Sequence, residues 1–151
     1  MTEPRIRVLC IDDEARILRA LKALFRDMEV YTTTEPTEAI RWSVEHDIDV
    51  VVCDQRMPKM QGIEVLREIR IAHPRAMRVL LTGYADLNAV LGSVNEGEVF
   101  RYVNKPWDNT ELREIVHLAS KIARDTPVIQ EKPIDEFDRE QARRQVGILV
   151  I

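Results

Sequence analysis

Five side chains with acid–base or nucleophilic potential stand at the ends of short apolar runs: Asp12, Asp13, Asp54, Thr82 and Lys105. Oxygen ligands of this kind suit a hard divalent cation such as Mg²⁺. A carboxylate can also act as a nucleophile, while a cation and a lysine neutralise the charge on a phosphoryl group in transfer. These residue types therefore indicate metal-assisted phosphoryl-transfer chemistry, provided that the fold brings them together.

The apolar runs beside these side chains have the composition of buried parallel strands. Residues 50–53 read Val-Val-Val-Cys, without polar alternation, which is typical of a strand covered on both faces. Short apolar or β-branched runs of this kind predict five strands, at residues 6–11, 30–33, 50–53, 78–82 and 99–103. Apolar residues at helical spacing follow each run and predict five helices. This alternation indicates an α/β fold with a five-stranded parallel sheet and helices on both of its faces.

Right-handed connections place the carboxyl ends of all parallel strands at one edge of the sheet, where open α/β folds bind their ligands. Each of the five side chains also has a simpler interpretation. Acidic residues suit a helix N-terminus, Thr82 precedes a turn-forming glycine, and Lys105 precedes a proline in an expected loop. Together, however, every expected strand except the second ends in a group that phosphoryl transfer needs, which favours a single site.

Electrostatics adds a reason to expect a metal ion at this edge. Carboxylates held close together repel one another and raise each other's pKa values, and a divalent cation removes that repulsion. We expect Asp54, kept ionised by the metal and by Lys105, to attack phosphorus as the nucleophile. Thr82 is expected to donate a hydrogen bond to the phosphoryl group once it is attached.

The composition limits the remaining classes of function. The chain of 151 residues suffices for one domain with a substantial core, and its net charge of −4 argues against direct nucleic-acid binding. Because no apolar run reaches membrane-spanning length and the N-terminus lacks a signal-peptide core, we expect a cytoplasmic protein. The scattered histidines have no zinc-site spacing. Cys10 and Cys53 are expected to be buried and reduced, with a redox contact as the alternative if their strands are neighbours.

Four short motifs occur in order along the chain: Asp12-Asp13, Asp54 with Met57-Pro58 and Gly62, Thr82-Gly83, and Lys105-Pro106. Over residues 5–124 this combination resembles the receiver domain of two-component response regulators, the CheY-like type. The resemblance implies a flavodoxin-like (βα)5 fold with strand order 2-1-3-4-5, so that the first and third strands are adjacent. It also implies a cis peptide bond between Lys105 and Pro106.

The resemblance further implies a signalling switch rather than an enzyme. Asp54 would accept a phosphoryl group from a phosphohistidine of a sensor histidine kinase. Asp13, Asp54 and the backbone carbonyl of Arg56 would bind Mg²⁺ directly, and Asp12 would act through water. Lys105 would pair with the phosphoryl oxygens.

A second set of implied residues concerns the response to phosphorylation. Thr82 and Tyr102 would form a switch pair, in which Thr82 moves toward the site and the aromatic ring moves inward. The population of the surface formed by the fourth helix, fifth strand and fifth helix would then shift. This surface would contact a downstream output domain or partner protein, or form a homodimer. The bulky Arg56 and Tyr84 would hinder the attacking water, which predicts slow loss of the phosphoryl group.

Two alternatives stay open beside this hypothesis. One is a degenerate receiver that acts only as a binding module, against which the retention of all five site residues argues. The other is a Mg²⁺-dependent phosphohydrolase of the haloacid-dehalogenase type. Enzymes of that type usually carry a second acid two residues after the nucleophile, where this chain has Arg56.

The pattern changes after residue 124. Residues 125–146 are highly charged and contain two prolines, which predicts a linker that is partly helical. Residues 147–151, Gly-Ile-Leu-Val-Ile, are apolar and similar to residues 7–11. They predict the first strand of a following domain, and the alternative is a tail that is disordered or packs on a sheet edge or a neighbouring molecule.

Overall fold

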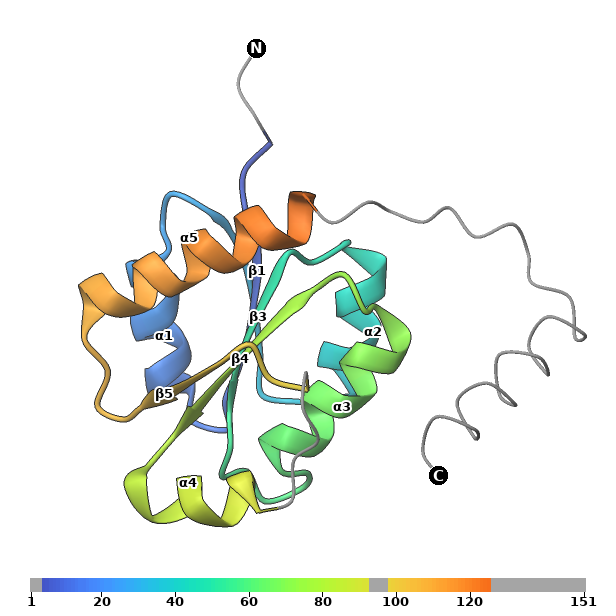
Figure 1. The fold of residues 1–151 in the computed structure, drawn as a ribbon. Coiled ribbons are helices and arrows are strands. Elements are labelled where there is room, and N and C mark those ends of the chain that lie inside the picture. The colour runs from blue at the N-terminus through green and yellow to red at the C-terminus, as the bar shows by residue number, and fades with distance from the viewer. Residues whose placement is uncertain (1–3, 93–97, 126–151) are drawn as a thin grey trace, which may run out of the picture.

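The computed structural model describes residues 4–92 and 98–125, apart from the side chain of Tyr84 (Figure 1). Within these residues, five parallel strands form one sheet in the order β2-β1-β3-β4-β5. The strands are β1 (Arg7–Ile11), β2 (Glu29–Thr33), β3 (Val50–Asp54), β4 (Met77–Thr82) and β5 (Arg101–Asn104). The predicted α/β fold and its strand order are therefore confirmed, although β5 begins at Arg101 rather than at residue 99.

Five helices of the described chain alternate with these strands: α1 (Ala15–Leu24), α2 (Pro36–Glu45), α3 (Gly62–Ala72), α4 (Tyr84–Leu91) and α5 (Asn109–Asp125). Figure 1 shows α1 and α5 on one face of the sheet and α2 and α3 on the other. Helix α4 adds Val90 to the core on the α2 and α3 side. Both faces of the sheet are thus covered, which explains why its central strands are apolar throughout.

The two cysteines show how this sheet divides the core. Strands β1 and β3 are neighbours, with Cys10 aligned to Val52 and Ile11 aligned to Cys53. Because successive side chains point to opposite faces, Cys10 packs in the core under α1 and α5, whereas Cys53 packs under α2 and α3. Burial raises the pKa of both thiols. The redox contact considered above is therefore excluded by geometry, and the cysteines are buried hydrophobic residues as expected.

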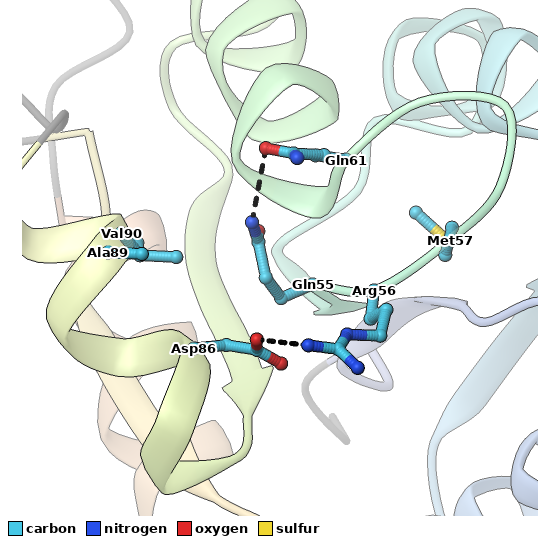
Figure 2. Close-up of a pocket in the computed structure, with 7 residues that line it drawn as sticks. All are labelled: Gln55, Arg56, Met57, Gln61, Asp86, Ala89 and Val90. Atoms are coloured by element: carbon cyan, nitrogen blue, oxygen red, sulfur yellow. Dashed lines mark hydrogen bonds and ion pairs between the residues drawn. The ribbon is translucent and has the colours of Figure 1, made fainter.

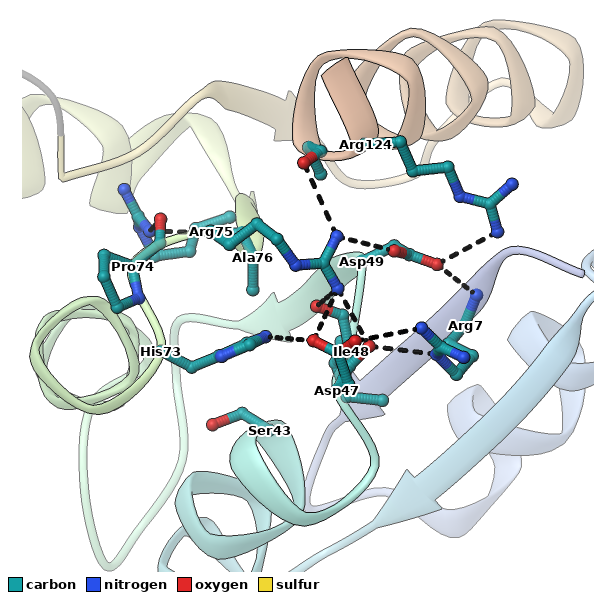
Figure 3. Close-up of polar contacts among 12 residues, drawn as sticks. Arg7, Ser43, Asp47, Ile48, Asp49, His73, Pro74, Arg75, Ala76 and Arg124 are labelled. Carbon is teal, nitrogen blue, oxygen red and sulfur yellow. Dashed lines mark hydrogen bonds and ion pairs between the residues drawn. The ribbon is translucent and has the colours of Figure 1, made fainter. Parts of the chain in front are cut away.

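Charged side chains at the amino edge of the sheet hold several elements together (Figure 3). Asp49 is only 1% exposed and accepts hydrogen bonds from the backbone N–H of Arg7 at 2.9 Å, from Arg75 at 2.9 Å and from Arg124 at 3.3 Å. Asp47 pairs with Arg75 at 2.7 Å and with Arg7 at 3.2 Å. We call these five residues the Asp49 cluster. It fixes the start of β1, the α3–β4 connection and the end of α5, far from the carboxyl edge.

The remaining sequence predictions concern the end of the chain. The expected linker lies outside the described residues except for Asp125, which ends α5. The apolar segment 147–151 also lies outside them. In the described part of the chain, no helix is both long enough and apolar enough to cross a membrane.

Candidate functional site

The structure brings the five predicted side chains to the carboxyl edge of the sheet. Asp54 and Thr82 are the last residues of β3 and β4, and the other three directly follow β1 and β5. Carboxylate oxygens of Asp12, Asp13 and Asp54, which we call the acidic cluster, lie within 4.8 Å of one another. An open cavity of about 590 Å³ lies over this edge, and Asp54, Thr82 and Lys105 line it.

Lys105 provides the positive charge nearest to the acidic cluster. Its Nζ lies 2.5 Å from Asp54 Oδ1 and 3.5 Å from Asp12 Oδ2. Its backbone N–H donates to the carbonyl of Thr82 at 3.0 Å, and its bond to Pro106 is cis, as the resemblance implies. Burial disfavours the ammonium ion, but the hydrogen bond and charge of Asp54 outweigh it, so the pKa of Lys105 is raised. Lys105 is therefore fully charged at neutral pH.

Burial has the largest effect on the pKa values of Asp12 and Asp54. Asp12 is 1% exposed, and burial raises its pKa to about 6, although the backbone N–H of Glu14 donates to Oδ1 at 2.9 Å. Burial likewise raises the pKa of Asp54, while Lys105 acts in the opposite direction. Burial therefore opposes the ionisation of both carboxylates, and a nearby cation would relieve that cost.

The donor set fits a hard divalent cation. Every side-chain ligand in the acidic cluster is a carboxylate oxygen, the type that Mg²⁺ prefers. Asp12 Oδ2 is buried and accepts no hydrogen bond, even though Lys105 Nζ is 3.5 Å away. A buried carboxylate oxygen that accepts no hydrogen bond is costly, and a cation or a cation-bound water would satisfy it.

The loop that follows β3 lies very close to the first turn of α3. A β-carbon on Gly62 would be 2.2 Å from the carbonyl oxygen of Asp54, so only glycine fits at this position. The buried side chain of Gln55 accepts a hydrogen bond from the backbone N–H of Ile63 at 2.9 Å. This contact was missed from the sequence, because a glutamine after a strand carries no signal of which helix it will contact.

Two side chains beside the cavity connect this loop to α4. Arg56 NH2 donates to Asp86 Oδ1 at 2.6 Å, and Figure 2 shows the two side chains facing each other across the space between the loop and α4. The sequence placed Arg56 at the site through its backbone carbonyl but gave no role to Asp86. Its only sequence signal was an acid in the first turn of a helix, which is common.

The two expected switch residues lie on neighbouring strands and on the same face of the sheet. Leu80 is aligned with Tyr102 and Thr82 with Asn104, so Thr82 lies one side-chain repeat beyond Tyr102 along the strands. Thr82 is 1% exposed, whereas Tyr102 is partly buried against the core under α2 and α3. Their switch role stays a prediction. The side chain of Tyr84, the other bulky group expected near the site, is outside the described part.

The fold and the site together define a flavodoxin-like α/β domain with a potential cation site at the carboxyl edge of its sheet. Comparison with known families identifies it more closely, because the profile of the response regulator receiver domain matches residues 8–117. The chain belongs to the response regulator receiver domain family, and the predicted resemblance is confirmed. It is therefore a signalling module of two-component systems rather than an ordinary enzyme.

Individual relatives agree with this membership. The receiver domain of an HD domain-containing protein from Pseudomonas fluorescens is 29% identical, with a TM-score of 0.75 over 82% of this chain and 93% of that chain. A response regulator receiver domain protein from Clostridium thermocellum is 35% identical, with a TM-score of 0.72 over 79% of this chain and 97% of that chain. The hydrogenase transcriptional regulatory protein HoxA of Cupriavidus necator is 34% identical over 120 residues, 79% of this chain. This chain spans only 25% of the length of HoxA.

Proposed function

We propose that Asp54 is the phosphoacceptor of this receiver domain and that its phosphorylation is the signal. The contact between Asp54 Oδ1 and Lys105 Nζ, 2.5 Å apart within the acidic cluster, carries this proposal. An Asp54 oxygen attacks the phosphorus of a phosphohistidine on a sensor histidine kinase. The new O–P bond forms as the P–N bond breaks, and its electron pair returns to the imidazole of the kinase.

The neighbouring residues divide the remaining work. Lys105 neutralises one negative charge on the phosphoryl oxygens, and the hydroxyl of Thr82 donates a hydrogen bond to them after transfer. Asp13, Asp54 and the backbone carbonyl of Arg56 would hold Mg²⁺, with Asp12 acting through water. When bound, the ion supplies positive charge that stabilises the transferring phosphoryl group.

The output of the switch is a shift in the population of the α4–β5–α5 surface. Thr82 moves toward the phosphorylated Asp54, and Tyr102 turns into the space that Thr82 leaves. Exposed apolar side chains on this surface, Leu91 on α4 with Leu118 and Ile122 on α5, are suited to contact a partner protein, an output domain or a second copy of the chain. Because its kinase partner transfers phosphate inside the cell, we place the domain in the cytoplasm.

Intact-mass analysis after incubation with acetyl phosphate and Mg²⁺ tests the phosphoacceptor directly. We expect a single phosphoryl adduct on the unmodified protein and no adduct on Asp54→Ala. Asp86→Ala is the matched control, because Asp86 lines the same cavity but is not an expected acceptor, and it should keep the adduct.

Each other outcome favours an alternative. No adduct under forcing conditions would favour a binding module. Rapid turnover of acetyl phosphate without an adduct would favour a phosphohydrolase, and an adduct that survives in Asp54→Ala would place the acceptor elsewhere.

A further inference from the structure

Gln55 follows Asp54 directly, and the function proposed above gives it no role. The residue is only 7% exposed, and its polar groups form hydrogen bonds with the neighbouring elements. Its backbone N–H donates to the carbonyl of Leu81 in β4 at 3.0 Å, and its backbone carbonyl accepts from the N–H of Gly62 at 2.9 Å. Its side-chain Oε1 accepts from the N–H of Ile63, also at 2.9 Å. One residue therefore joins the end of β3 both to β4 and to the start of α3.

The first turn of α3 depends on these bonds. The first N–H groups of a helix have no acceptor within the helix, and a side chain at the N-cap position usually satisfies one of them. Gln61 occupies the N-cap position but makes no capping hydrogen bond. Figure 2 shows that its Oε1 instead faces Gln55 Nε2, at 3.5 Å. Gln55 thus supplies the cap from the other end of the loop, and this hydrogen bond joins the two ends of the loop formed by residues 56–61.

The position of Gln55 in the chain connects this cap to the proposed chemistry. Its neighbour on one side is Asp54, the proposed phosphoacceptor, and its neighbour on the other side is Arg56, whose carbonyl is a proposed metal ligand. Any rotation of the backbone at Gln55 would therefore move two proposed ligands at once. The bonds to Leu81, Gly62 and Ile63 oppose such a rotation.

We propose that Gln55 is a positioning residue for this site: its side-chain Oε1, by capping α3 at Ile63, holds the loop in the geometry that metal binding and phosphoryl transfer require. The inference rests on the proposed function, since it assigns Gln55 a task at the same site. Groups that orient metal ligands typically change metal affinity by about 10–100-fold when they are removed. A displacement of about 1 Å at a reacting group can slow transfer by roughly 100-fold.

Three variants separate the cap from the rest of the side chain. Gln55→Met keeps the length of the side chain and removes the acceptor, whereas Gln55→Glu keeps an acceptor that suits a helix N-terminus. Gln61→Met makes the same chemical change in the same pocket at a residue without a capping bond. For each protein, Mg²⁺ affinity is measured by calorimetry, and the rate of adduct formation from acetyl phosphate at saturating Mg²⁺ is measured by intact mass. Thermal unfolding is measured in parallel.

We expect Gln55→Met to bind Mg²⁺ about 10–100-fold more weakly and to form the adduct more slowly even at saturating Mg²⁺. Gln55→Glu and Gln61→Met should stay close to the unmodified protein in both measurements. A Gln55→Met protein that is folded and less stable, but unchanged in Mg²⁺ affinity and rate, would reduce Gln55 to a structural role and overturn the proposal. Equal losses in Gln55→Met and Gln55→Glu would overturn it too, because the acceptor would then not be the cause.

Amide hydrogen exchange in the unmodified protein gives a test that needs no variant to fold. If the cap supports the metal ligands, the metal must support the cap to the same extent. Mg²⁺ should therefore slow exchange at Ile63 more than at Leu112, a reference amide in the first turn of α5. Equal protection of both amides would overturn the proposal. Neither this exchange nor the Mg²⁺ titration requires phosphorylation. Failure of the proposed function would instead appear as a missing adduct on the unmodified protein.

Discussion

Gly62→Ala should damage the site through the backbone alone. A β-carbon at this position would lie 2.2 Å from the carbonyl oxygen of Asp54 and 2.9 Å from the Cα of Gln55. These neighbours are backbone atoms and cannot rotate away as a flexible side chain could. Since real β-carbons essentially never approach closer than 3.0 Å, the end of β3 and the start of α3 must separate by at least 0.8 Å.

The size of the effect follows from that displacement. Forcing one extra carbon into a close-packed contact typically costs about 1–3 kcal/mol, and an obstruction made only of backbone belongs at the upper end of that range. A shift of almost 1 Å at the reacting carboxylate should slow phosphorylation by roughly 100-fold. Urea unfolding measures the first effect, and the rate of adduct formation from acetyl phosphate at saturating Mg²⁺ measures the second.

Gly83→Ala is the matched control, because Gly83 also adjoins a site residue at the end of a strand. A β-carbon there would have no atom within 4 Å, and the backbone angles of −79° and 161° are open to any residue. We expect its stability to change by less than about 1 kcal/mol, with no loss of rate. If Gly62→Ala behaved like this control, the close approach of α3 to Asp54 would not matter and the reasoning would be refuted.

Three further perturbations test the charges around the sheet. With the metal removed by a chelator, Asp12→Asn should stabilise the protein at pH 7.5 by up to about 3 kcal/mol, because it removes a buried charge whose pKa is raised to about 6. The stabilisation should shrink as the pH falls through 6, where Asp12 itself becomes neutral. Urea titrations at several pH values measure both effects. Asp49→Ala should cost about 3 kcal/mol of unfolding free energy, since it removes a buried carboxylate that accepts hydrogen bonds from Arg75, Arg124 and the backbone of Arg7. Arg16→Ala, at an exposed ion pair, should cost less than about 1 kcal/mol. Arg56→Ala should shorten the lifetime of the phosphoryl adduct, followed by intact mass over time, and an unchanged lifetime would contradict the expected hindrance of water.

Local patterns were enough to predict the elements and the edge at which they place their polar ends. Periodicity separates buried strands from amphipathic helices, and the rule for right-handed connections then brings the strand ends together. The family resemblance added the strand order. The same reasoning could not place Cys10 and Cys53 on opposite faces, because that depends on the register between β1 and β3 rather than on either strand alone.

Contacts between residues distant in the chain were the part that no pattern indicated. Asp49 finds its partners Arg75 and Arg124 at separations of 26 and 75 residues. Gln55 caps a helix that begins beyond a loop, whereas sequence rules look for the cap directly before the helix. In both cases the residue type allows many partners, and only the folded chain selects among them.

The two edges of the sheet use aspartates in opposite ways, and the difference argues for the proposed site. At the amino edge, the two acids of the Asp49 cluster face three arginines, so their charge is neutralised within the chain. At the carboxyl edge, the three acids of the acidic cluster face the single ammonium of Lys105, which leaves an excess of two negative charges. An anionic phosphoryl donor would be repelled by that excess, whereas one divalent cation would cancel it. The acidic cluster is therefore suited to phosphoryl transfer only together with a cation. Without the cation, the repulsion between its carboxylates lowers the stability of the fold, a loss that functional sites commonly carry.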